Sequence, residues 1–280
     1  MVAHSLRYLA NCSIMFTELP LLRRPAAARS AGFEAVEFWW PFDGPVPGDA
    51  AVGKFVAAIA DAGVALVALN FFAGDLAGPD RGVLSIPDRS RQFTDNIEVT
   101  VEIGARLGVR GFNALYGNRV AVLPPGQQDD LAVANIAAAA AAAAAIGGTV
   151  FIESLSGPGP YPLRLAADAA AVVGRARAAG AENVGILFDL YHLAVNGDDI
   201  DRAIAAHADR IAHVQIADAP GRGEPGSGRL DLDGYLSRLE QAGYDGWIAL
   251  EYRPTVSTPD SLGWLPRARR AGPPGPDTPG

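Results

Sequence analysis

The chain has 280 residues, of which 49% are hydrophobic and 19% are charged. This composition is typical of a folded protein with an ample core, and it excludes intrinsic disorder over most of the chain. The 23 basic and 31 acidic side chains give a formal charge of −8, which argues against a nucleic-acid partner because such proteins present basic surfaces. The length fits two small domains or one α/β barrel, since such barrels usually span about 250 residues.

The single cysteine, Cys12, can form neither an intrachain disulfide nor a cysteine-rich zinc site. Arg7 and Asn11 interrupt the apolar stretch that a secretory signal would need. The longest weakly polar segment, residues 131–146, is dominated by alanine and is too short to span a bilayer. We therefore expect a soluble, cytoplasmic protein with no membrane partner.

Eight short apolar runs, rich in β-branched or aromatic residues, recur along the chain and predict strands. Successive runs begin 27 to 45 residues apart, an interval that suits one strand, one helix and two loops. The predicted strands are residues 8–13, 35–41, 66–71, 111–117, 149–155, 184–192, 211–218 and 246–253.

The segments between these strands contain few helix breakers and many good helix formers. The nine alanines at 137–145 are flanked by Ile136 and Ile146, which predicts an outer helix packed closely on a sheet. Five glycines, at positions 32, 63, 108, 180 and 243, lie where a helix should end. The predicted helices are residues 50–62, 89–107, 130–146, 163–179 and 200–208.

Eight uninterrupted strand–helix units predict the α/β class and a single (β/α)₈ TIM barrel rather than a doubly wound sheet. We expect this barrel to occupy residues 1–270 as one catalytic domain. The segment 271–280 holds four prolines and three glycines in ten residues, which predicts a disordered tail. A G-x-G-x-x-G match at residues 221–226 is interpreted as a flexible loop, because a dinucleotide fingerprint needs its last glycine inside a helix.

Each of the last four predicted strands holds one polar, metal-competent side chain among apolar neighbours. A carboxylate in a barrel strand is costly to bury unless it is paired or coordinates a metal. Strands five to eight are adjacent in a barrel, so these side chains can converge at its C-terminal mouth. Their oxygen ligands suit Mg²⁺ or Mn²⁺, although each could instead be satisfied separately by hydrogen bonds. The four residues are Glu153, Asp189, Gln215 and Glu251.

Three carboxylates around a divalent ion leave a formal charge of −1, so an anionic substrate would need further cationic groups. Arg253 lies on the predicted eighth strand nearer the mouth, and Arg222 lies in the glycine-rich loop after the seventh. His192 closes the predicted sixth strand. A solvated arginine or an internally satisfied histidine is the alternative at each position. His213 shares a face with Gln215 one layer deeper, where we expect a supporting role.

The sequence resembles the hydroxypyruvate isomerase family of the xylose-isomerase-like barrels over residues 8–264. The most specific part is the loop Arg-Gly-Glu-Pro-Gly at 222–226, which follows His-Val-Gln-Ile-Ala-Asp at 213–218. The glutamine on strand seven also supports this resemblance, because related sugar epimerases and xylose isomerases usually carry a histidine there. Further similar segments are residues 10–16, 32–38, 188–192 and 246–252.

The resemblance implies isomerisation of a small anionic hydroxy-keto acid, the interconversion of hydroxypyruvate and tartronate semialdehyde through an enediolate. It implies that Glu153 and Glu251 transfer the proton. It also implies a divalent metal, Mg²⁺ or Mn²⁺, held by Glu153, Asp189, Gln215 and Glu251, with a substrate lying near His192, Arg222 and Glu224. The chain departs from the family pattern at Ser154, where proline is common, and at Ser156, where asparagine is frequent.

Other functions remain open on the same scaffold. A ketose 3-epimerase or another small-sugar isomerase would turn over a neutral ketose. A phosphodiesterase would need a histidine-rich zinc cluster and a basic rim, and the chain has four histidines. A non-catalytic barrel would bind a ligand without turnover. The sequence leaves the oligomeric state open, with a homo-oligomer among the options.

Overall fold

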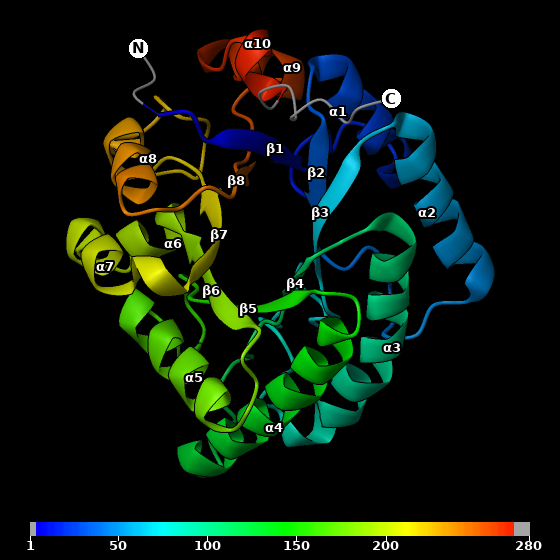
Figure 1. The fold of residues 1–280 in the computed structure, drawn as a ribbon, viewed down its shortest axis with the longest axis vertical. Helices are drawn as coiled ribbons and strands as arrows, with labels where there is room; N and C mark the ends of the chain where they lie inside the picture. Colours follow the sequence, from blue (N-terminus) through cyan, green and yellow to red (C-terminus); the bar gives the residue numbers. More distant parts are fainter. Residues whose placement is uncertain (1–3, 272–280) are drawn as a thin grey trace.

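The computed structural model describes residues 4–271 as a closed ring of eight parallel strands surrounded by helices (Figure 1). Each strand pairs with the next one along the chain, and β8 closes the ring on β1, with Tyr8 opposite Ile248. The predicted (β/α)₈ barrel is thereby confirmed. The strands are β1 (Arg7–Asn11), β2 (Ala35–Phe38), β3 (Ala65–Asn70), β4 (Gly111–Asn113), β5 (Thr149–Glu153), β6 (Val184–Asp189), β7 (Ile211–Ile216) and β8 (Trp247–Leu250).

The five predicted helices are present with bounds shifted by up to five residues, whereas α1, α6, α9 and α10 were not predicted. All five glycines expected after helices have positive φ angles, which glycine adopts readily because it has no Cβ atom. The helices are α1 (Arg24–Ala31), α2 (Asp49–Ala62), α3 (Ser90–Leu107), α4 (Pro125–Ala144), α5 (Ala166–Ala178), α6 (Leu190–Val195), α7 (Ile200–His207), α8 (Leu232–Gln241), α9 (Thr258–Ser261) and α10 (Arg267–Arg270).

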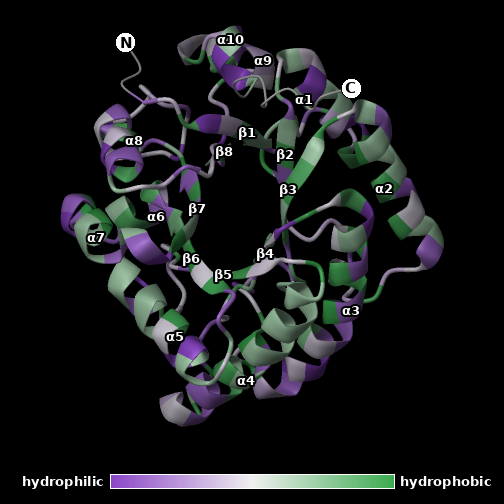
Figure 2. Cartoon of the chain, in the orientation of Figure 1, coloured by the Kyte–Doolittle hydropathy of each residue, from purple (hydrophilic) through white to green (hydrophobic). Residues whose placement is uncertain are grey.

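Apolar side chains fill the layer between the strands and the helices. Hydrophilic residues gather on outer helices such as α7 and α8 (Figure 2). The alanine run contributes to the buried face of α4, where Ala139, Ala140 and Ala143 are buried and the helix packs against β5, whereas Ala138 and Ala141 are exposed. The small alanine side chains permit this close approach. No helix within residues 4–271 is long and apolar enough to cross a membrane.

Alternation along the strands decides which side chains enter the barrel. On β5, Val150 and Ile152 join the outer core, whereas Phe151 packs inside the barrel with Leu187. Glu153 follows Phe151 by two residues and therefore faces the interior at the C-terminal mouth. Gly111 makes room for this packing, because a Cβ there would lie 2.5 Å from the Phe151 ring.

Of the predicted tail, residues 272–280 lie outside the part of the chain that the structure describes. The tail therefore stays a prediction.

Candidate active site

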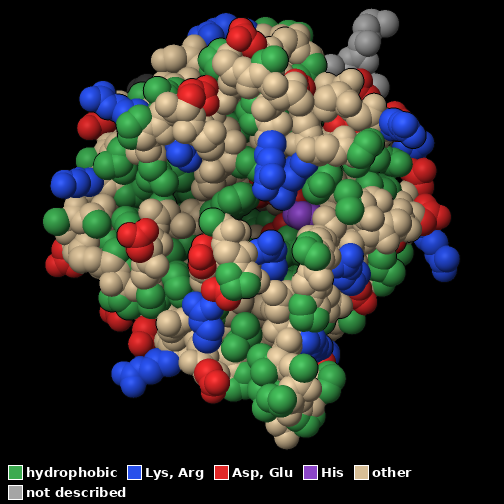
Figure 3. All heavy atoms as spheres, turned by 180° about the vertical axis from the view of Figure 1, so that it is seen from behind, with side chains coloured by type: hydrophobic (Ala, Val, Ile, Leu, Met, Phe, Trp, Pro, Cys, Tyr) green, Lys and Arg blue, Asp and Glu red, His purple; other side chains and the backbone are tan. Residues whose placement is uncertain are grey.

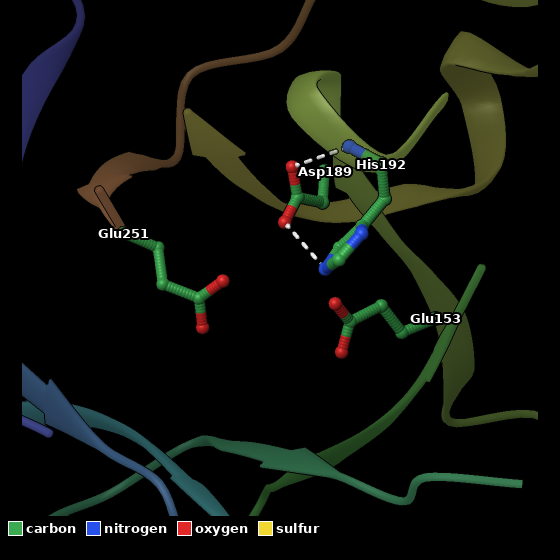
Figure 4. A group of neighbouring side chains, drawn as sticks. All are labelled: Glu153, Asp189, His192 and Glu251. Atoms are coloured by element: carbon green, nitrogen blue, oxygen red, sulfur yellow. Dashed lines mark hydrogen bonds and ion pairs between the residues drawn. The ribbon is translucent and has the colours of Figure 1, made fainter. Parts of the chain in front are cut away.

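The four side chains predicted to meet at the mouth lie at the ends of neighbouring strands. Glu153 and Asp189 are the last residues of β5 and β6, Gln215 is the penultimate residue of β7, and Glu251 directly follows β8. All four are at most 4% exposed. Figure 4 shows the three carboxylates pointing toward one another, with His192 between two of them. Ligand atoms of these three carboxylates and of His192 all lie within 4.8 Å of one another.

A cavity of about 730 Å³ opens above these residues. On the face seen in Figure 3, the molecule is hollowed at its centre, with basic side chains around the hollow and a histidine at its floor. The ionisable side chains that line the cavity include Arg81, Glu153, His192, Arg222, Glu251 and Arg253.

Glu251 is oriented by four donors from distant parts of the chain. Its Oε1 accepts hydrogen bonds from Trp39 Nε1 at 2.7 Å, Asn11 Nδ2 at 3.1 Å and Gln215 Nε2 at 3.2 Å. Its Oε2 pairs with the guanidinium of Arg222. These contacts hold the carboxylate in one orientation facing the other acids.

Arg222 supplies the positive charge inside this acidic cluster. Besides Glu251, its Nη2 lies 4.0 Å from Asp189 Oδ2. Its backbone has φ 61°, a left-handed conformation that is unusual for a residue with a side chain. The Arg253 backbone N–H donates to the Arg222 carbonyl at 2.7 Å and helps to hold this conformation.

His192 lies on helix α6, and the prediction that it closes the sixth strand is wrong. Asp189 ends β6 and caps α6, because its side chain accepts hydrogen bonds from the backbone N–H groups of Tyr191 at 2.8 Å and His192 at 3.2 Å. The helix turn brings the imidazole back over the strand end, where Nε2 lies 3.6 Å from Asp189 Oδ2. The same carboxylate that starts the helix thus positions the histidine.

The tautomer of His192 follows from its hydrogen bonds. The backbone N–H of Ser156 donates to Nδ1 at 3.0 Å, and the Ser156 hydroxyl lies 2.7 Å from the same atom. Burial, together with the charges of Arg222, Arg164 and Arg81, holds the pKa of His192 well below its usual range. A neutral imidazole that accepts at Nδ1 carries its proton on Nε2. His192 therefore presents a donor to the site, and not the lone pair that a metal ligand needs.

Gln215 has an amide whose orientation is fixed by carboxylates. Its Nε2 donates to Glu37 Oε1 at 2.7 Å and to Glu251 Oε1 at 3.2 Å. Because a carboxylate only accepts, the nitrogen must occupy this side. The buried Oε1 of Gln215 has no hydrogen-bond partner among the described residues. An unpartnered buried amide oxygen beside carboxylates fits the donor set of a hard divalent cation.

The surroundings raise the pKa values of all three carboxylates. Burial raises the pKa of Glu251 to about 8, although Arg222 opposes the rise. Burial, and then the charges of Glu251 and Asp189, raises the pKa of Glu153 well above its usual value. The pKa of Asp189 is also raised, chiefly by burial. One arginine therefore does not neutralise the cluster, and a second cationic group would relieve it.

The remaining predicted residues lie at different depths. Arg253 is exposed and lines the mouth, two residues past the buried Glu251, in the loop after β8. Glu224 is outside the cavity lining, and its carboxylate accepts a hydrogen bond from the Thr255 backbone N–H at 3.0 Å. It thereby joins the loop after β7 to the loop after β8. His213 is buried one layer below Gln215, as expected.

Sequence reasoning missed several residues of the network, including Asn113, which donates to Glu153. Asn11 and Glu37 are buried polar residues at the mouth ends of β1 and β2, and Arg81 lies in the loop after β3. Glu37 shows the same pattern that identified the polar residues of the last four strands, since it is a lone carboxylate in an apolar run. Arg81 had no local signal among the 22 arginines of the chain.

The chain belongs to the xylose isomerase-like TIM-barrel family, whose model matches residues 25–268. It is 51% identical over 271 residues to a Streptomyces coelicolor protein with the provisional name hydroxypyruvate isomerase, covering 95% of this chain and 97% of the relative. It is 30% identical to the hydroxypyruvate isomerase of Escherichia coli (93% and 98% covered). It is 34% identical to the 2-oxo-tetronate isomerase of Cupriavidus necator (92% and 97%). The chain is an aldose–ketose type isomerase.

Among solved structures, a Brucella melitensis protein described as an AP endonuclease of family 2 matches with a TM-score of 0.84. It is 32% identical, over 93% of this chain and 98% of that one. An L-ribulose 3-epimerase matches with a TM-score of 0.70 at 25% identity, over 88% and 81%. In residues 4–271 of the present chain, His192 is the one histidine in a close group of potential ligands, which disfavours the histidine-rich zinc cluster of a phosphodiesterase.

Proposed function

We propose that the chain is a metal-dependent isomerase that interconverts hydroxypyruvate and 2-hydroxy-3-oxopropanoate (tartronate semialdehyde). The observation that carries this proposal is the convergence of Glu153, Asp189 and Glu251, two of which line one cavity. The unpartnered Oε1 of Gln215 belongs to an amide that contacts Glu251. The hydroxypyruvate isomerases among its relatives support the substrate. A cytoplasmic location agrees with a single, buried, unpaired cysteine.

Mg²⁺ or Mn²⁺ would be held by oxygens of Glu153, Asp189, Gln215 and Glu251. When bound, the cation would stabilise the negative charge that develops on the carbonyl and hydroxyl oxygens of the substrate. His192 would donate a hydrogen bond from its Nε2–H group to a substrate oxygen.

The reaction removes a proton from C3 of hydroxypyruvate to give an enediolate, moves the proton of the C3 hydroxyl to the C2 oxygen, and returns a proton to C2. We assign these transfers to Glu153 and Glu251, which face each other across the cluster (Figure 4). Glu153 accepts one hydrogen bond on Oε2, from Asn113 Nδ2 at 2.7 Å, and among the described residues none donates to its Oε1. That oxygen is available to take a proton.

The substrate carboxylate needs a cation of its own. Three carboxylates, a divalent ion and Arg222 sum to zero, and Arg222 is already paired with Glu251. Arg81 and Arg253 line the cavity, and neither pairs with a carboxylate in the described part of the chain. We assign the recognition of the substrate carboxylate to these two arginines.

Replacing both Arg81 and Arg253 with methionine is expected to lower kcat/KM for hydroxypyruvate by about 10²–10⁴-fold, since hydrogen bonds to charged groups contribute about 1.5–3 kcal/mol each. Turnover of dihydroxyacetone, which lacks the carboxylate, should stay within a few-fold. Arg106→Met, at an exposed position, is the matched control. Equal losses on both substrates would contradict the assignment.

A four-carbon 2-oxo acid is a second candidate substrate. Pockets of about 300–1,000 Å³ hold drug-sized ligands, so a three-carbon acid fills little of the 730 Å³ cavity. The similarity to a 2-oxo-tetronate isomerase favours the same extension. A ketose 3-epimerase stays the alternative, which fast turnover of a neutral ketohexose without turnover of hydroxypyruvate would establish.

The decisive test is incubation of metal-stripped protein with hydroxypyruvate in D₂O, with and without added Mg²⁺ or Mn²⁺. We expect aldehyde formation and deuterium incorporation at carbon only when the metal is present, because proton exchange accompanies the enediolate. Equal turnover after exhaustive chelation would disprove metal dependence. Metal-loaded protein that forms neither aldehyde nor deuterated product would disprove the substrate assignment.

A further inference from the structure

Glu37 is a buried carboxylate on the opposite side of the barrel from β5 and β6. It lies in β2, between Val36 and Phe38, and is 2% exposed. It takes no part in the proton transfers proposed above. Burying a carboxylate in this position is costly unless hydrogen bonds compensate it.

Both oxygens of Glu37 are fully engaged by protein donors. Oε2 lies 2.6 Å from His213 Nε2, and Oε1 accepts hydrogen bonds from Gln215 Nε2 at 2.7 Å and Asn11 Nδ2 at 2.8 Å. The His213 ring is itself fixed, because it stacks on Phe151 with ring centroids 5.3 Å apart. Glu37 is therefore a rigid acceptor, and it is not a member of the close group of potential metal ligands formed by Glu153, Asp189, His192 and Glu251.

This arrangement matters because a glutamine amide has two ends of nearly equal size but opposite hydrogen-bonding character. If the Gln215 amide turned over, its NH₂ group would replace Oε1 at the proposed metal site. The second acceptor, Glu251 Oε1, lies farther from Nε2, at 3.2 Å, and also serves Trp39 and Asn11. Glu37 thus provides the shorter contact that selects the orientation.

We propose that Glu37, anchored by His213, is a positioning residue that turns the oxygen of Gln215 toward the divalent cation. The inference rests on the metal site proposed above. It also explains how this barrel uses a glutamine, whose amide can turn over, as a ligand. Partners that orient metal ligands typically contribute 10–100-fold to metal affinity.

The test is a double-mutant cycle on metal-stripped full-length protein, with the Mn²⁺ dissociation constant measured from the electron paramagnetic resonance signal of free Mn²⁺. Glu37→Gln should weaken Mn²⁺ binding by about 10–100-fold. In a Gln215→Glu background, either carboxylate oxygen can serve as ligand, so the same substitution should cost less than about threefold.

Glu37→Asp keeps the charge but withdraws the carboxylate by one methylene, so it separates geometry from electrostatics and should also weaken binding. Thr100→Val removes a buried hydrogen bond on α3, away from the site, and should leave Mn²⁺ affinity unchanged. Thermal unfolding of the metal-free variants monitors the fold.

The outcomes separate the two proposals. Wild-type protein that fails to bind Mn²⁺ would remove the metal site and with it this inference. Tight binding by the wild type together with equal losses for Glu37→Gln in both backgrounds would overturn the positioning role alone. A loss confined to the Gln215 background, and reproduced by Glu37→Asp, would support it.

Discussion

Replacing Glu251 with glutamine is expected to lower kcat for hydroxypyruvate by about 10²–10⁴-fold, the usual contribution of a general acid or base. Glutamine is nearly isosteric, and its oxygen can still accept from Trp39 and Asn11. Its NH₂ group cannot take a proton, and it would face the donors of Arg222. Initial rates of aldehyde formation at saturating Mg²⁺ measure the effect.

The fold should survive this substitution, because no cavity is created and Arg222 keeps its contact with Asp189. Losing one partner of a buried ion pair should nevertheless lower the thermal midpoint. Glu182→Gln removes an exposed carboxylate away from the site and is the matched control. If the barrel only bound a ligand without catalysis, Glu251→Gln would leave ligand affinity and any measured turnover unchanged. Turnover above one tenth of the wild-type value would rule out the assigned role.

Replacing Arg222 with methionine is expected to lower the unfolding free energy of the metal-stripped protein by about 3–5 kcal/mol, the usual cost of removing one partner from a buried ion pair. Glu251 and Asp189 would then be left together in a buried site without their arginine. Urea denaturation followed by circular dichroism measures the loss.

Saturating Mn²⁺ should return part of the stability lost in Arg222→Met, because the cation supplies positive charge to the same carboxylates. Arg106→Met, which removes an exposed pair with Glu102, should change the unfolding free energy by less than about 1 kcal/mol. Equal destabilisation of Arg222→Met with and without Mn²⁺ would show that the arginine and the cation do not share one site.

Local patterns in the sequence determined the barrel and the members of the acidic cluster. The repeated strands, the glycines after helices and the alanine face of α4 each depend on neighbours within a few residues, so they can be recognised without a structure. Glu153, Asp189, Gln215 and Glu251 were recognisable because a polar residue inside an apolar strand needs a partner.

The tertiary structure alone decided how these side chains are oriented. His192 became a donor from a helix because Asp189 caps α6 and Ser156 holds Nδ1. Glu37 meets a glutamine 178 residues away in the sequence, and Arg81 joins the mouth from the loop after β3. Closure of the barrel creates these contacts between residues far apart in the chain. A local sequence pattern does not predict which distant donor will bind which acceptor.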